Sequence, residues 1–498
     1  MKFSGFKFSS GLKYLLTILI VTLSINVFSL ASNQQLERMQ GMAEEYINLG
    51  INLIYYGRFY QNESVPFVFR PPGYPFFIGT VLKLWGGLPE KNQKHNIQRI
   101  KERIKMAFTI VYFAQAILLS FSSIILFLWL SHFLDHKIAM LIAISFGCNT
   151  YMIILTGLLH YSILHVFFVI LSSYTLMLVL REDKINSMKI LGAGFLWGVC
   201  TLVKALTLIL PAFVFIIFLQ KFMPHWKNSV RFTIIFSIGM SIAILPYTIR
   251  NYYMTNKFIP INAQAGAVLW AATIPQEKPD SNHYNWWNLW RGDGERIYSA
   301  VTKSPSFEYH TYIENNLVLE DAYREQAYEN FSRNPEIYFK NFFRKFISFN
   351  LEINSVFIKI FQIIQEPDAN INIKKWLKLG SPQNFYPSTA EKAFKYLIDV
   401  LAVFGMLGIC IALKRKEPHI VLPGIIFFNF CIAYSITYLD LMYYYIKIPF
   451  LFIFFAFFID SLRSFSVKIP FTNMSISFST ILCSLIIIWT MGLNAAVL

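Results

Sequence analysis

Long apolar runs recur along the whole chain, and they constrain its fold more than any other feature. When helical, runs of about 18 to 20 apolar residues match the thickness of a bilayer core. Only 14% of the 498 residues are charged and 55% are hydrophobic, whereas a soluble chain carries about 25% charge. The sequence therefore predicts an all-α polytopic membrane protein. Its roughly eleven predicted spans are 14–31, 107–130, 138–156, 163–180, 189–203, 205–221, 230–249, 396–413, 419–437, 443–460 and 475–494.

The loop cations predict how these spans are oriented. Segment 73–87 is apolar but short, which favours an external helix in the membrane interface rather than a further span. Most basic loops then fall on the cytoplasmic side, as the positive-inside rule requires. Loop 88–106 is the exception, but a crossing at 73–87 would move every later basic loop outside. The cations predicted to be cytoplasmic are Lys2, Lys7, Lys13, Lys137, Arg181, Lys184, Lys189, Lys221, Lys227, Lys414, Arg415, Lys416, Arg463 and Lys468.

This orientation places two long segments outside the membrane, 32–106 and 250–395. A structureless loop of the second length is uncommon, so helices are expected within it. Helical periodicity runs over 306–335 and ends at Pro335, and the apolar segment 342–363 is predicted to lie along the membrane. The predicted divisions are an N-terminal transmembrane catalytic module at 1–249 that includes the first external loop 32–106, the external region at 250–395, and C-terminal transmembrane helices at 396–498.

Charge and cysteine usage exclude several classes of function. The chain carries 44 Lys and Arg against 28 Asp and Glu, a net charge of +16, but no nucleic-acid recognition motif accompanies this excess. Cations at the ends of spans account for it, so no nucleic-acid partner is predicted. The five cysteines lie in apolar segments without paired spacing, which is typical of small core residues rather than of disulfides or a zinc site.

The N-terminal run Tyr14–Ala31 has two interpretations. It follows three lysines and ends in SLAS, which resembles the cleavage site of a signal peptide. Because many more spans follow, we predict a retained first span, with a cleaved signal peptide as the alternative.

Two features of the first external loop suggest chemistry. Glu44 and Glu45 precede an apolar helical pattern, and a carboxylate just outside a membrane can act as a general base. The alternative is an ordinary acidic helix start. Arg70 lies in FRPPGYPFF, where three prolines and a glycine restrict the backbone. Its guanidinium can bind phosphate oxygens in a bidentate fork, or it can contact lipid headgroups.

Other polar residues lie at predicted external ends of spans. His160 and Ser162 occur in TGLLHYSILH, where the imidazole could accept a proton, bind a metal or serve a structural role. Lys204 separates two apolar runs, and Arg250 follows the run 230–249. A cation in such a place either meets an anion or snorkels to the interface. Walker, dinucleotide, HExxH and GxSxG motifs are absent from the sequence.

Three segments in this order carry a family resemblance. They are EEYINLGINLIYYGRFY…FRPPGYPFF, LWGVCTLVKALTLILP and LPYTIRNYYMTNKFIPINAQAGAVLW, with a weaker fourth, YYYIKIPFLFIFFAFFI. Across residues 14–270 the chain resembles the bacterial GT-C membrane glycosyltransferases, relatives of the protein O-mannosyltransferases and of the lipid A aminoarabinose transferase. The resemblance implies a GT-C fold with about eleven transmembrane helices and extracytoplasmic helical loops.

The resemblance also implies an activity. Such enzymes transfer a sugar from a polyprenyl-phosphate-linked donor to a lipid, glycan or protein acceptor, usually with inversion. They act on the outer face of the cytoplasmic (inner) membrane, among membrane lipids, with the active site facing the periplasm or exterior. Glu44 and Glu45 take the place of the catalytic acidic residue, and Arg70 that of the cation that binds the carrier phosphate. A phosphate leaving group needs little protonation, so Lys204 and Arg250 are further candidates to stabilise its charge.

The sequence departs from the family pattern at several positions. Met42 stands where the family often has Asp, and Ser162 where the second external turn commonly has an acid, with His160 two residues earlier. Val-Lys-Ala around Lys204 replaces Thr-Arg-Pro, and a tyrosine near Tyr444 replaces a late arginine. These departures leave open the identity of the base and the use of a divalent cation as cofactor.

Two other functions remain open at this point. A transporter or flippase of lipid-linked sugars would favour charged or broken helices at mid-membrane, which the spans lack apart from Lys204. An inactive homologue that binds carrier lipid is the third possibility.

Overall fold

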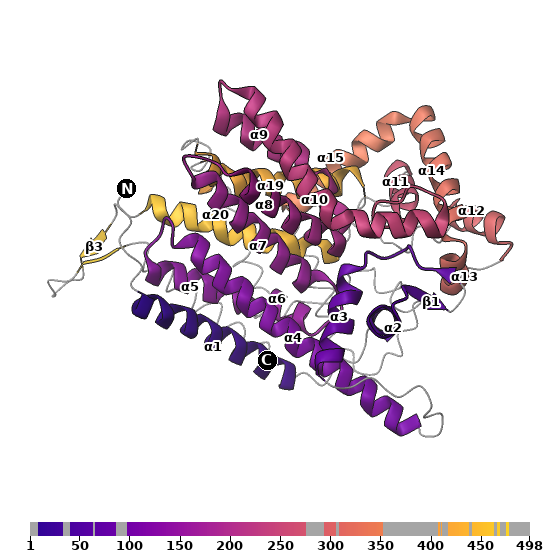
Figure 1. Cartoon of the computed structure of the whole chain (residues 1–498), viewed down its shortest axis with the longest axis horizontal. Helices are drawn as coiled ribbons and strands as arrows, with labels where there is room; N and C mark the ends of the chain where they lie inside the picture. The colour runs from indigo at the N-terminus through magenta and orange to yellow at the C-terminus, as the bar shows by residue number, and fades with distance from the viewer. Residues whose placement is uncertain are drawn as a thin grey trace, which may run out of the picture.

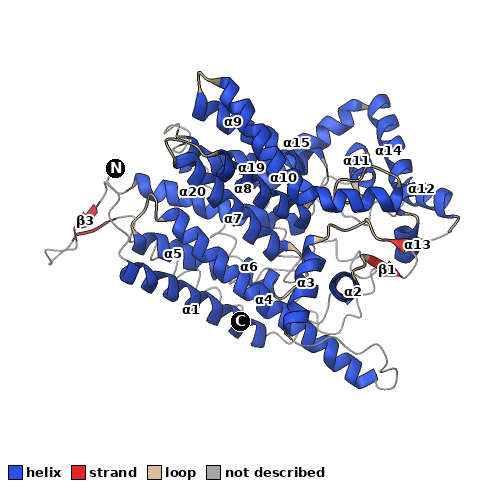
Figure 2. Cartoon of the chain, viewed as in Figure 1, coloured by secondary structure: helices blue, strands red, loops and turns tan. Residues whose placement is uncertain are grey.

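The computed structural model describes residues 8–32, 40–62, 65–85, 97–274, 293–304, 308–351, 407–408, 410, 417–437, 441–462, 466–468 and 475–477. Within them, long helices lie side by side in a bundle (Figure 1), and the only strands in this described part form two short hairpins (Figure 2). Seven of these helical segments are long and apolar enough to cross a membrane. This confirms an all-α, multi-pass membrane protein.

The span-length segments are listed here with their bounds. They are α1 (Phe8–Ser32), α4 (Ile97–Leu130), α7 (Ser162–Arg181), η2 with α9 (Ala205–Ile209 and Leu210–Phe222), α10 (Trp226–Thr255), α19 (Pro418–Ile436), and η4 with α20 (Leu441–Ile446 and Lys447–Ser461). Two shorter apolar helices, α5 (His136–Gly147) and α8 (Ser187–Val203), pack beside them in the described part of the chain.

The predicted span 138–156 is two helices rather than one. Helix α5 ends at Gly147, and α6 (Thr150–Thr156) begins after Asn149, whose Oδ1 accepts the Met152 N–H at 3.4 Å. A Cβ on Gly147 would lie 2.3 Å from Ser123 Oγ, so a glycine is needed where α5 meets α4. A helix cap that competes with the continuous helix therefore breaks this span.

Two other predicted boundaries differ from the structure. Helix α10 continues to Thr255, beyond the predicted span end at residue 249, so Arg250 lies within the helix rather than after it. Residues 475–477 form strand β4 (Ser475–Ser477), which pairs with β3 (Ser466–Lys468), so the predicted last span does not begin as a helix. The remainder of that span, and most of 396–413, lies outside the described residues.

Two short helices, α2 (Gln40–Tyr56) and α3 (Gly73–Leu84), pack against each other beside one end of the bundle (Figure 1). At 12 residues α3 is about 18 Å long, shorter than the hydrocarbon core, as expected for a helix that does not cross. A Cβ on Gly79 would lie 2.2 Å from the Gly50 carbonyl oxygen, so the two backbones approach closely. The hairpin of β1 (Tyr60–Asn62) and β2 (Val65–Pro66) connects the two helices.

A second group of helices lies at the same end (Figure 1). It comprises α11 (Ala265–Thr273), α12 (Asp293–Thr302), α13 (Tyr309–Glu314), α14 (Asn316–Arg333) and α15 (Pro335–Leu351). This confirms the helices predicted over 306–335, but Pro335 also begins α15, because proline suits the first helical position. Leu49, Phe67 and Phe69 share an apolar core with Trp270 and Tyr323, so the described part of 250–395 packs on the first loop.

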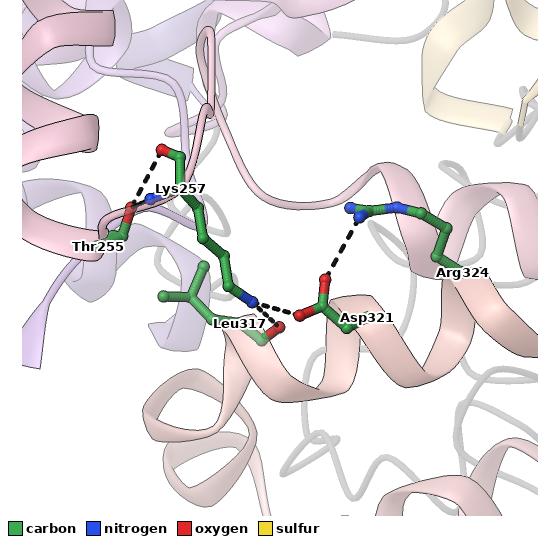
Figure 3. Close-up of polar contacts among 5 residues, drawn as sticks. All are labelled: Thr255, Lys257, Leu317, Asp321 and Arg324. Carbon is green, nitrogen blue, oxygen red and sulfur yellow. Dashed lines mark hydrogen bonds and ion pairs between the residues drawn. The ribbon is translucent and has the colours of Figure 1, made fainter.

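An ion-pair network also ties α10 to α14 (Figure 3). Lys257, just after α10, contacts Asp321 on α14 and donates to the Leu317 carbonyl at 3.5 Å. Arg324 pairs with the other Asp321 oxygen at 3.3 Å. These charges are nearly half exposed, so each pair contributes at most about 1 kcal/mol.

A buried carboxyl joins α14 to α11. Glu320 Oε2 accepts the Gly266 N–H at 2.5 Å, and a Cβ on Gly266 would lie 2.1 Å from the Glu320 carbonyl oxygen. Burial raises the pKa of Glu320 from 4.5 to about 7, against the opposing effect of the Gly266 and Ala267 N–H groups and Arg324. The carboxyl is therefore half protonated near neutral pH.

This pKa predicts a pH-dependent stability. The pKa of Glu320 is higher in the folded state than in the unfolded state. The contribution of Glu320 to the free energy of unfolding is therefore fully present below pH 4.5 and is lost as pH rises through about 7. Relative to Glu320→Gln, we expect the free energy of unfolding of the wild type to fall by about 3 kcal/mol between pH 4.5 and 8. Thermal unfolding in detergent across this range measures the difference. Parallel pH profiles for the two proteins would contradict the prediction.

Candidate functional site

A buried ion pair joins the two predicted features of the first loop. Arg70 Nε donates to Glu45 Oε1 at 3.3 Å, and Nη2 donates to Oε2 at 3.2 Å. The Glu45 side chain is 2% exposed and that of Arg70 is 16% exposed. Two parallel bonds of this kind fix the orientation of both groups. The carboxylate and the guanidinium, 25 residues apart in sequence, therefore form one unit.

The FRPPGYPFF turn is held in place by close packing. Pro72 caps α3, and a Cβ on Gly73 would lie 2.8 Å from the Leu202 carbonyl oxygen at the end of α8. The Phe69 ring stacks on the Arg70 guanidinium, whose central carbon is 4.8 Å from the ring centroid. Gly73 thus permits the turn to lie against the end of α8, two residues before Lys204.

Lys204 lies between two tyrosine rings. Helix α8 ends at Val203, and Lys204 is extended (φ −148°, ψ 119°) before η2 begins. Its Nζ donates to the Tyr161 hydroxyl at 2.8 Å, and lies 4.8 Å from the Tyr161 ring centroid and 4.3 Å from that of Tyr443. Tyr443 belongs to η4, from the fourth sequence segment. Aromatic faces stabilise a cation by about 0.5 to 2 kcal/mol each.

His160 and Ser162 flank Tyr161 on the turn between α6 and α7. The His160 Nδ1 and the Ser162 Oγ form a short hydrogen bond. Burial, then Lys204, Arg70 and His165 in decreasing order, lower the pKa of His160 to about 3. The imidazole is therefore neutral, and it lies within electrostatic reach of both cations.

Tyr46 packs beside the ion pair of Glu45 and Arg70. It follows Glu45 on α2, its ring packs edge-on against Tyr74, and the Arg70 guanidinium lies 5.6 Å from its centroid. Burial raises the pKa of Tyr46 to about 12; Arg70 opposes this shift and Glu45 adds to it. His160 lies within electrostatic reach of both Arg70 and Lys204, so the structure brings together Glu45, Arg70, His160, Ser162 and Lys204. We call these five residues the site cluster.

Arg250 has different partners. Its Nη1 donates to the Phe67 carbonyl at 3.0 Å and to Asn251 Oδ1 at 2.9 Å, and its Nη2 donates to the Phe59 carbonyl at 2.8 Å. These carbonyls flank the β1–β2 hairpin, which leads into the Arg70 turn. The contacts give Arg250 a bracing role, and its predicted contact with phosphate stays a prediction.

The comparisons with known proteins concern structure alone. No family model and no curated protein sequence matches the chain. Among solved structures, the Archaeoglobus fulgidus oligosaccharyltransferase complex with Zn and sulfate is similar, with a TM-score of 0.52 and 12% identity over 96% of this chain and 52% of that chain. The archaeal oligosaccharyltransferase AglB from the same organism, in complex with an inhibitory peptide and a dolichol-phosphate, is also similar. It has a TM-score of 0.51 and 13% identity, and the match covers 97% of this chain and 55% of that chain.

The chain has the GT-C fold. It spans about half the length of the oligosaccharyltransferases that it matches. ArnT from Cupriavidus metallidurans, bound to undecaprenyl phosphate, is also similar, with a TM-score of 0.39 and 12% identity over 89% of this chain and 77% of that chain. The likeness to the two oligosaccharyltransferase structures confirms the fold that the sequence motifs predicted.

Two predicted features of this GT-C chain stay open. Glu44 lies on α2, but its side chain falls outside the described residues. Across the described part of the chain, no three His, Cys, Asp or Glu side chains are grouped to hold a metal ion. Glu45 is engaged by Arg70, and His160 by Ser162, so the site cluster offers no ready set of ligands. A divalent cation stays an untested prediction.

Sequence reasoning missed three residues of the site. The ring of Tyr46 lies beside Arg70, and the rings of Tyr161 and Tyr443 lie beside Lys204. Each tyrosine is next to a predicted site residue or within a segment that carries the family resemblance. Tyr161 stands between His160 and Ser162, and Tyr443 opens a run of three tyrosines. Three tyrosines together in an otherwise phenylalanine-rich span indicate polar contacts within the bundle, because a buried tyrosine hydroxyl usually has a hydrogen-bond partner.

Proposed function

We propose that the protein is an inverting membrane glycosyltransferase. It takes a sugar from a polyprenyl-phosphate-linked donor and transfers it to a lipid, glycan or protein acceptor on the extracytoplasmic face of the cytoplasmic membrane. The observation that carries the proposal is the site cluster, in which a buried carboxylate and two cations from distant segments meet. The GT-C fold, and the dolichol-phosphate in one similar structure, add support.

Three charged residues take part in the proposed reaction. The acceptor oxygen attacks C1 of the sugar, the C1–O bond to the phosphate breaks, and the acceptor proton passes to Glu45. Arg70 holds the carboxylate in position and, with Lys204, stabilises the charge that develops on the leaving phosphate. A single displacement of this kind inverts the configuration at C1.

A sugar-transfer assay that compares two lysine variants tests the proposal. The full chain is reconstituted in proteoliposomes with a labelled polyprenyl-phosphate sugar and membrane lipid extract. We expect labelled product, and we expect Lys204→Met to lower kcat/KM for the donor about 10- to 100-fold, because a charge-assisted bond contributes about 1.5 to 3 kcal/mol. Lys257→Met is the matched control, since Lys257 lies at the same end but pairs with Asp321.

Two results would contradict the proposal. Labelled lipid that crosses the membrane without forming product would identify a flippase instead. Equal donor kinetics in Lys204→Met and Lys257→Met would remove Lys204 from the phosphate site.

A further inference from the structure

His160 is held in one ring orientation at the centre of the site cluster. Its Nδ1 is hydrogen-bonded to Ser162 Oγ, its backbone N–H donates to the Leu158 carbonyl at 2.8 Å, and its ring lies 4.0 Å from the Tyr161 ring. Tyr161 in turn accepts the hydrogen bond of Lys204. The imidazole therefore stands beside the phosphate-binding cations with one nitrogen already engaged.

The second ring nitrogen distinguishes His160 from its neighbour His165. In His165, Nδ1 bonds to the Tyr445 hydroxyl at 2.7 Å, and Nε2 is enclosed without a partner among the described residues. The Nε2 of His160 also has no hydrogen bond to the described residues, but this atom is not fully buried as the Nε2 of His165 is. The His160 residue as a whole is 5% exposed. His160 can thus present Nε2 to a ligand, whereas His165 cannot.

The charges around His160 explain why it is neutral in the ligand-free site. Lys204, Arg70 and His165 are the titratable groups within its electrostatic reach, and Glu45 neutralises Arg70. A third permanent cation would repel the other two and would lose hydration on burial. Neutral histidine avoids both costs until an anion arrives.

We propose that His160 takes up a proton at Nε2 when the carrier phosphate binds, and then acts as the third cation of the phosphate site. The inference rests on the proposed function, because it assumes that a phosphate binds between Arg70 and Lys204. The proton comes from solvent on binding and returns to solvent when the carrier phosphate leaves. Between these events the imidazolium stabilises the charge that develops as the C1–O bond breaks.

The charge of a phosphate is sufficient for this change. One unit of opposite charge in contact, at an effective dielectric constant of about 20, changes a pKa by about 3. The pKa of His160 would then rise from about 3 in the empty site to about 6 in the complex. Binding becomes coupled to proton uptake in mildly acidic solution.

Calorimetry with a probe that does not itself titrate tests the inference. A polyprenyl methyl phosphodiester has no proton to exchange near neutral pH, so any uptake comes from the protein. The full chain in detergent is titrated with it at pH 5 to 7.5, in buffers of different ionisation enthalpy. We expect uptake approaching one proton below about pH 6, with affinity rising towards tenfold per unit as pH falls.

Three variants assign the proton. In His160→Asn we expect pH-independent affinity and no uptake. His160→Gln is a second variant without a titratable ring, and it should show the same loss of uptake, which covers the case in which His160→Asn fails to fold. His132→Asn is the control, since His132 bonds to Tyr174, 12 residues along α7 from Ser162 and so about 18 Å away.

The outcomes separate this inference from the proposed function. The inference is overturned if the wild type does not bind the probe, or binds it without taking up a proton. It is also overturned if uptake persists in His160→Asn or is lost in His132→Asn. Proton uptake by a protein that transfers no sugar would keep the inference and overturn the proposed function.

Discussion

Glu45→Gln is expected to lower sugar transfer by about 10²- to 10⁴-fold, the usual loss when a general base is removed. Glutamine keeps the shape of the side chain and can still accept one bond from Arg70, so the turn should remain folded. The base has lost its charge, however, and the acceptor proton has no destination. Transfer rates at saturating donor and acceptor measure this loss, because it falls on kcat.

Two further variants make the assignment specific. Glu329→Gln changes a carboxylate that is more than half exposed and pairs with Arg333 on α14, so its rate should stay within about twofold of the wild type. Glu44→Gln tests the neighbouring acid. If Glu44→Gln abolishes transfer while Glu45→Gln remains active, the base is Glu44 and the ion pair with Arg70 is structural.

Gly79→Ala is expected to lower transfer by about 100-fold, although residue 79 touches no substrate. A Cβ there would lie 2.2 Å from the Gly50 carbonyl oxygen and 2.6 Å from Ile54, so α2 and α3 must move apart. Helix α2 carries Glu45 and Arg70 precedes α3, so the ion pair would separate with them. A displacement of about 1 Å in a reacting group can cost 100-fold in rate, and overpacking costs about 1 to 3 kcal/mol of stability.

Gly192→Ala is the matched control for this helix contact. Gly192 lies within α8, and nothing lies within 4 Å of a Cβ placed on it. The change should leave transfer unaltered and raise the free energy of unfolding by up to about 1 kcal/mol, because alanine is the better helix former. Transfer assays and thermal unfolding in detergent on both variants provide the comparison. Wild-type activity in Gly79→Ala would show that the α2–α3 contact does not position Glu45.

The structure changes the interpretation of Arg70. From sequence, Arg70 was predicted to bind a carrier phosphate or lipid headgroups. In the structure its Nε and Nη2 hold the buried carboxylate of Glu45, so it orients the proposed base, and its contact with a carrier phosphate stays a prediction. No sequence pattern relates these two residues, because their proximity depends on the packing of α2 against α3 through Gly50 and Gly79.

The sequence by itself determined the class of the protein and most of its transmembrane helices. Apolar length and loop charge are local properties, so Ser162–Arg181 and the separation of Ser187–Val203 from Ala205–Phe222 at Lys204 could be predicted residue by residue. The break after Gly147 and the extension of α10 to Thr255 could not, since a side-chain cap and contacts with the loops decide them.

Only the tertiary structure decided which predicted residues share a site. The site cluster comes from α2, the turn before α3, the turn into α7 and the end of α8, and the packing of Gly73 on the Leu202 backbone brings the Arg70 turn to the end of α8 beside Lys204. Arg250 on α10 instead donates to backbone carbonyls that flank the β1–β2 hairpin, and Tyr443 of η4 packs against Lys204. Residue types limit which chemistry is available, but the distances between charges depend on backbone contacts between segments far apart in the chain.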